Sequence, residues 1–151
     1  MLLEMEQNLK NSKLSWHIGP TEDWIFKIQN TKFNLAPRGF GRTSFRLCEI
    51  IQLGRIPVYL YDDIPWLPYQ GTDLDFSTYG ISGQMGQLKT LVENLSSMSN
   101  TTVQSMLDQI LIVREHYTYQ GVINQINKFI LDPLGPQGGQ LRCTTVPKKD
   151  H

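Results

Sequence analysis

The feature that most constrains this chain is a glycine-rich loop between a short extended segment and a helix. Apolar and polar side chains alternate up to Pro37, which predicts a short strand over 33–37. The loop that follows, 37–44, reads PRGFGRTS and leads into a helix expected to end at Gly54. A second β-rich run lies at 55–61. This order of strand, loop, helix and strand predicts a parallel α/β unit.

A loop of this composition suits a phosphate. The backbone N–H groups at a helix N-terminus are unpaired and carry the positive end of the helix dipole. Gly39 and Gly41 let the backbone approach a diphosphate closely, and Arg38 can bind a phosphate through two hydrogen bonds. Ser44 can donate to a phosphate, cap the helix, or do both. The alternative interpretation is an ordinary turn between strand and helix, in which Arg38 and Arg42 are solvated.

Carboxylates near this loop extend the candidate site. Glu49 follows on the helix, where it can hold the ribose hydroxyls of a nucleotide or form an ion pair with Arg46, three residues earlier. The loop 62–69 leaves the second strand at its carboxyl end, where open α/β sheets bind ligands. We therefore expect Asp62 and Asp63 to line the same site.

The segment 31–69, TKFNLAPRGFGRTSFRLCEIIQLGRIPVYLYDDIPWLPY, resembles the core signature of the exostosin-type glycosyltransferases. The shared pattern is KFxLxPRGxGxxSxRLxE, followed by a helix that closes at LG, the strand RIPVY and a proline-bearing aromatic loop. The likeness is dense over these residues and extends to about residue 130. It implies the C-terminal, donor-binding, Rossmann-like half of a two-domain GT-B glycosyltransferase, here incomplete and rich in helices.

By this resemblance, the chain would take part in the inverting transfer of a sugar from a nucleoside diphosphate sugar, UDP-linked, to a glycan acceptor. The donor is then a substrate, and neither a cofactor nor a metal ion is expected. The expected donor-binding residues are Arg38, Gly39, Gly41, Ser44, Arg46, Glu49, Asp62 and Asp63.

The resemblance also implies that the general base and the acceptor site come from an N-terminal lobe. No residue of this chain stands out as a catalytic base. We therefore expect the chain alone to bind the donor weakly and transfer to require that lobe. The alternative is a non-catalytic fragment or pseudoenzyme that acts as a binding module. The sequence does not identify the sugar, the nucleotide or the acceptor.

Composition adds limits on partners and location. The 151 residues carry fourteen basic and fourteen acidic side chains, so no global field recruits nucleic acid or an anionic membrane. Exostosin-like enzymes are expected in the Golgi or another secretory-pathway membrane, anchored by an upstream segment. No apolar run here approaches the ~18 residues that span a bilayer. We therefore expect a fragment of a longer protein or a lineage without the anchor.

Three further features are expected to carry no chemistry. His17, His116 and His151 are far apart in the sequence and lack metal-ligand spacing. Asp73 and Asp75 fit an Asp-x-Asp pattern that arises often by chance, and they are interpreted as solvated loop residues. With two cysteines in the sequence, we expect no disulfide framework.

The chain is expected to divide into three parts. These are a helical lead-in at 1–30, the nucleotide-sugar-binding domain at 31–131 and a disordered tail at 132–151. Residues 62–83 are expected to form a long loop. Three helices are expected after it, at 84–95, 102–117 and 119–131. The apolar stripes at 103–113 and 122–130 are expected to belong to the core.

Overall fold

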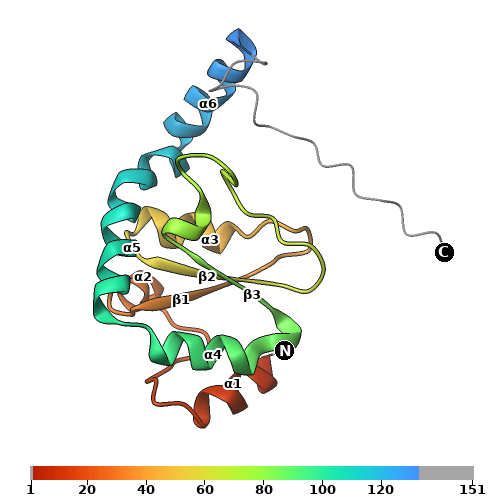
Figure 1. The fold of residues 1–151 in the computed structure, drawn as a ribbon, viewed down its shortest axis with the longest axis vertical. Coiled ribbons are helices and arrows are strands. Elements are labelled where there is room, and N and C mark those ends of the chain that lie inside the picture. Colours follow the sequence, from red (N-terminus) through yellow and green to blue (C-terminus); the bar gives the residue numbers. More distant parts are fainter. Residues whose placement is uncertain (1, 133–151) are drawn as a thin grey trace, which may run out of the picture.

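The chain folds as an α/β unit in which helices cover both faces of one parallel sheet (Figure 1). The computed structural model describes residues 2–132, so the expected tail from residue 133 onward lies outside the described residues. The sheet has three strands in the order β1–β2–β3. The predicted α/β class is therefore confirmed, and the architecture is Rossmann-like in kind.

The three strands are β1 (Phe33–Pro37), β2 (Ile56–Tyr61) and β3 (Ile81–Gln84). The central strand β2 is buried along its first five residues, as expected for a parallel strand covered on both faces. Its pairing with β1 begins at Ile56, but its pairing with β3 begins only at Val58. Pro57 therefore lies where β2 has a neighbour on one side only, and its missing N–H is tolerated there.

The strand β3 overlaps the segment 62–83 that was predicted to be a loop, and its last residue, Gln84, was predicted to begin a helix; both parts of the prediction are wrong here. The segment also contains a short 3-10 helix, η1 (Phe76–Thr78). The sequence of β3, ISGQ, has no strong strand pattern of its own. It forms a strand because pairing with β2 satisfies its backbone groups.

Six α-helices and two further 3-10 helices complete the described fold. They are α1 (Leu2–Lys10), α2 (Trp24–Gln29), α3 (Phe45–Gln52), η2 (Met85–Gln87), α4 (Leu88–Ser97), α5 (Asn100–Val113), η3 (Arg114–Tyr117) and α6 (Tyr119–Leu131). Gly54 ends α3 with a φ of 71°, the left-handed conformation predicted for that position. None of the described helices has both the length and the apolar character that crossing a membrane would take.

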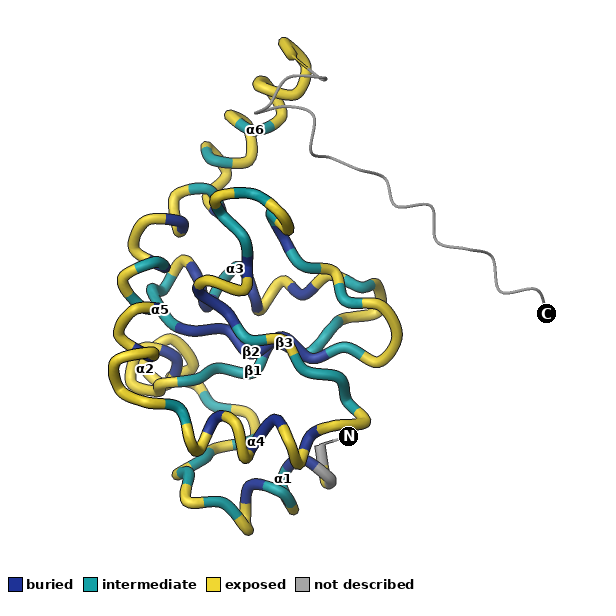
Figure 2. Tube along the Cα trace, viewed as in Figure 1, coloured by how far each residue is buried: buried dark blue, intermediate teal, exposed yellow. Residues whose placement is uncertain are grey.

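Each face of the sheet contributes to its own apolar core (Figure 2). One core lies between the sheet and the helices α3 and α5, and Tyr59 of β2 belongs to it. The other lies between the sheet and the helices α1 and α4, and it takes Val58 and Leu60 of β2. The alternation of side chains along a strand explains this division. Met5 and Leu9 of α1, from the expected lead-in, belong to the second core.

The C-terminal helix α6 projects away from the sheet (Figures 1 and 2). None of its residues is buried, so the prediction that the stripe at 122–130 belongs to the core is wrong. The stripe at 103–113 does contribute to the core, through four buried residues of α5. The periodicity of the two stripes is alike, but the chain turns at η3 and carries α6 beyond the sheet. Only the tertiary path distinguishes them.

Candidate functional site

The glycine-rich loop lies at the carboxyl ends of β1 and β2 and leads into α3. The Arg38 N–H donates to the Leu60 carbonyl at an N···O distance of 2.9 Å, which ties the start of the loop to β2. The Gly39 N–H donates to the Thr43 carbonyl at 3.0 Å and closes the loop on itself. Ser44 precedes α3 in an extended conformation, is buried, and makes no side-chain capping bond. Its position is the one predicted, and its hydroxyl is left for another partner.

Neither glycine of the loop is required by its backbone conformation. The φ angles of Gly39 and Gly41 lie outside the left-handed region. A Cβ at Gly39 would lie 3.4 Å from the Thr43 carbonyl oxygen, an ordinary contact, and a Cβ at Gly41 would meet nothing within 4 Å. The fold of this loop therefore accepts alanine at Gly41. A need for glycine there would have to come from a bound molecule.

Two arginines and two aspartates meet where the loop approaches the end of β2, and we call Arg38, Arg42, Asp62 and Asp63 the loop-end cluster. An Nη of Arg38 contacts carboxylate oxygens of both Asp62 and Asp63, the latter at 3.2 Å. Arg42 donates to Asp63 through Nη2 at 3.1 Å and Nε at 3.3 Å. The sequence predicted Arg38, Asp62 and Asp63 for one site and left Arg42 open as a solvated loop residue; the structure brings all four together. Their formal charges cancel.

The cluster shifts the pKa of two of its members. The hydrogen bond to Asp62 raises the pKa of Arg38, and burial acts against it. The backbone N–H of Ile64, followed by Arg42, holds the pKa of Asp63 below its ordinary value. Both groups are therefore charged at neutral pH, and the cluster is a set of ion pairs.

Arg38 also shapes the loop that contains it. Its Nε donates to the Gly41 carbonyl at 3.2 Å, and its Nη2 donates to the Phe40 carbonyl at 3.2 Å. The side chain is only 19% exposed, against 54% for Asp62. Because most of its five N–H groups already have partners, a phosphate would share or replace some of these contacts.

Tyr59 connects the two loops of the site, 37–44 and 62–69. Its side chain is fully buried on β2. Its hydroxyl donates to the Arg42 carbonyl and accepts the Trp66 N–H at 3.4 Å. Tyr59 was not among the residues predicted for the site. The available signal was a polar hydroxyl inside an otherwise apolar strand that ends at the predicted site.

Arg46 and Glu49 are not part of the loop-end cluster. Their side chains form an ion pair with each other at an N···O distance of 2.8 Å. The Arg46 guanidinium also lies over the Trp24 ring, 4.9 Å from its centroid, and so faces α2. Among the described contacts, neither residue bonds to a member of the cluster. The sequence left two roles open for Glu49, ribose binding or an ion pair with Arg46, and the structure shows the ion pair.

Asp75 stabilises the turn that leads into η1. It accepts hydrogen bonds from the Gly71 N–H at 2.6 Å and the Ser77 N–H at 2.9 Å, and it caps η1. These bonds lower the pKa of Asp75. Within residues 2–132, no group of three or more His, Cys, Asp or Glu side chains is arranged to hold a metal ion.

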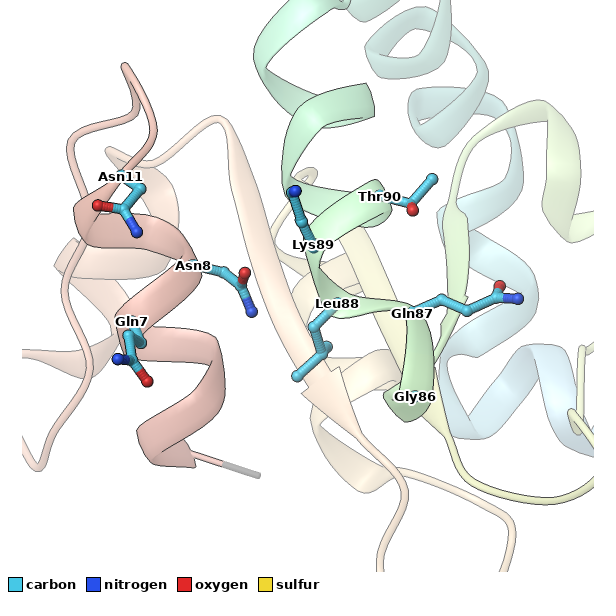
Figure 3. Close-up of a pocket in the computed structure, with 8 residues that line it drawn as sticks. All are labelled: Gln7, Asn8, Asn11, Gly86, Gln87, Leu88, Lys89 and Thr90. Carbon is cyan, nitrogen blue, oxygen red and sulfur yellow. The ribbon is translucent and has the colours of Figure 1, made fainter.

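A pocket of about 450 Å³ lies apart from the loop-end cluster, between α1 and the start of α4 (Figure 3). Side-chain amides dominate its lining, with Gln7, Asn8 and Asn11 on one wall and Gln87 and Lys89 on the other. It shares no residue with the predicted site. Neither an aromatic ring nor a carboxylate is among the described residues that line it.

Comparison with known proteins gives no family for this chain: no protein-family model and no curated protein sequence matches it. The chain can be described by its fold and its candidate site. It is a Rossmann-like α/β domain with an arginine-bearing loop at the carboxyl edge of its sheet.

Proposed function

We propose that this chain binds a nucleoside diphosphate sugar, UDP-linked, as the donor-binding part of an inverting, exostosin-like glycosyltransferase. The observation that carries the proposal is that Arg38 and Arg42, from the loop that leads into α3, meet at Asp63, at the carboxyl ends of two parallel strands. Ligands of open α/β sheets bind at this edge. The resemblance of residues 31–69 to the exostosin signature supports the same assignment.

In this proposal the diphosphate of the donor lies against the loop 37–44. Negative charge develops on the leaving diphosphate as the bond from the sugar to the nucleotide breaks. The unpaired N–H groups at the start of α3 and the guanidinium of Arg42 would stabilise that charge. The hydroxyl of Ser44 is available as a further donor. Asp62 and Asp63 hold the arginines in position and would line the sugar.

The acceptor, a glycan, and the general base that deprotonates it are assigned to an N-terminal lobe outside this chain. The chain alone would then bind UDP and UDP-sugars but not transfer the sugar. Glu49 remains the candidate for the ribose, and its pairing with Arg46 means that it would have to leave this partner.

Isothermal titration of the full chain with UDP and UDP-sugars tests the proposal. Loss of one charge-assisted hydrogen bond costs about 1.5–3 kcal/mol, so Arg42→Ala should weaken UDP binding by about 10- to 100-fold. Arg114→Ala is the matched control, because Arg114 is exposed on η3 and outside the cluster. Glu49→Gln tests the ribose contact separately.

Two results would contradict the proposal. One is a wild-type chain that binds neither UDP nor any UDP-sugar. The other is an equal loss of binding for Arg42→Ala and Arg114→Ala, since that would reflect net charge and not the site.

A non-catalytic binding module is the second candidate, and one observation favours it. The cluster satisfies its own charges, with each arginine already paired to a carboxylate. In this second candidate, the only role of the network is to hold the two loops together. In that case, nucleotide binding would be absent and disruption of the cluster would affect stability alone.

A further inference from the structure

The helix α6 presents a continuous apolar stripe that no described part of the chain covers. Phe129 is the least exposed of its large apolar residues, at 37%, and Tyr119 the most, at 94%. The stripe is formed by Tyr119, Val122, Ile123, Ile126, Phe129 and Ile130. A stripe of this size on a soluble domain marks a contact surface.

The spacing of the stripe is that of a helix that packs against another helix. Tyr119, Val122, Ile126 and Phe129 follow each other at intervals of three, four and three residues. This is the a/d pattern of a heptad repeat, which places knobs from one helix into holes of a second. The stripe therefore fits an apolar helical partner better than a flat surface.

The junction with η3 holds α6 in a defined direction. Thr118 caps α6, and its hydroxyl accepts the Gly121 N–H at 3.1 Å. Gly121 is packed tightly against η3, since a Cβ there would lie 2.2 Å from the Glu115 carbonyl oxygen. The helix thus extends from the body as a fixed arm (Figure 1), with its stripe accessible to a second molecule.

The charge of α6 restricts the partner. The helix carries one charged residue, Lys128, which lies on the face opposite the stripe at 100° per residue. A bilayer surface or an acidic partner would favour several basic residues on the polar face. The 19 residues that follow Asp132 offer three aliphatic side chains, Leu134, Leu141 and Val146, too few to match the stripe. A nearly neutral, apolar helix with the same spacing is required.

We propose that α6 pairs with α6 of a second copy of this chain, forming a symmetric dimer. A two-fold axis places the same stripe on both sides of the contact, which makes it self-complementary. With large apolar side chains that bury about 150–250 Å² each when fully covered, the half-exposed stripe contributes roughly 600 Å² per copy, or about 1,200 Å² in total. That area is at the lower end for a specific interface. We therefore expect a dimer that forms reversibly and depends on concentration.

Sedimentation velocity of the full chain tests this pairing. Between about 1 and 200 µM, the average mass should rise from 17.4 kDa towards twice that value. Ile126→Asp, at the centre of the stripe, should keep the protein monomeric throughout this range. Because Ile126 is half exposed and belongs to neither core, the variant should have the circular dichroism of the wild type, and the two should share one thermal midpoint at about 1 µM, where both are monomers.

The control is Asn124→Asp, which adds the same charge to α6 on the opposite face, where Asn124 is exposed. It should dimerise as the wild type does. Two results would overturn the proposal: a wild type that stays at 17.4 kDa at every concentration, and equal dissociation of both variants, which would show that the interface does not use the stripe.

Discussion

Replacement of Tyr59 by phenylalanine tests how the two loops of the site are held together. The ring of Tyr59 is fully buried, so phenylalanine fills nearly the same space and leaves no large cavity. The change removes only the hydroxyl, which donates to the Arg42 carbonyl and accepts the Trp66 N–H. We expect the fold to persist and the two loops to lose their common anchor.

The magnitude follows from the bonds that are lost. A net hydrogen bond contributes about 0.5–1.5 kcal/mol, and a buried group left without a partner costs about 1–3 kcal/mol. Because Trp66 is 42% exposed, water can replace its bond, whereas the Arg42 carbonyl faces the buried ring. We therefore expect Tyr59→Phe to lower the free energy of unfolding by about 1–2 kcal/mol.

Urea denaturation monitored by circular dichroism measures this change. With an m-value of about 2 kcal/mol/M, the midpoint should fall by about 0.5–1 M. Tyr61→Phe is the control, because Tyr61 lies on the same strand and its hydroxyl makes no hydrogen bond within residues 2–132. An unchanged midpoint for Tyr59→Phe, or an equal loss in both variants, would refute the anchoring role.

Three further predictions concern two glycines and a pair of buried tyrosines. Gly54→Ala should cost about 1–2 kcal/mol, because Gly54 has a φ of 71° and open space around it, so that backbone strain alone acts; Gly86→Ala, also in open space but at an ordinary φ, should change the urea midpoint little. Gly41→Ala should leave stability within about 0.5 kcal/mol of the wild type yet weaken UDP binding; a loss of stability would show that the loop needs glycine for its own fold. Burial raises the pKa of Tyr79 and Tyr117, whose hydroxyls are 2.5 Å apart, above the ordinary value of about 10. The unfolded chain then releases these protons first, so stability should fall as pH rises above about 10, and the Tyr79→Phe, Tyr117→Phe double variant should show a shallower fall in urea midpoints between about pH 8 and 11.

Local patterns were sufficient where a segment carries its own signals. Pro37 and Gly54 mark the ends of β1 and α3, and the periodicity of residues 119–131 predicts α6 with the observed bounds. These features depend on backbone conformation and helix geometry, which neighbouring residues largely determine. The strand β3 shows the limit, because its four residues become a strand only by pairing with β2.

The candidate site was predictable in part for the same reason. The glycine-rich loop and the pair Asp62 and Asp63 follow two parallel strands, so the topology brings them to one edge of the sheet. The partners within the site did not follow from the sequence. Arg46 could turn towards the loop or towards Trp24, and only the position of Trp24 in the folded chain decides between them.

The sequence by itself determined the α/β order of strands and helices, the position of the arginine-bearing loop and the amphipathic character of α6. Tertiary structure alone decided which arginine meets which carboxylate, that Tyr59 connects the two loops, and that one apolar stripe is buried while the other is exposed. The physical reason is the separation along the chain of the residues that interact. Turns, caps and helical periodicity arise from residues close in the chain, whereas burial and ion pairing depend on segments that meet only after the chain has folded.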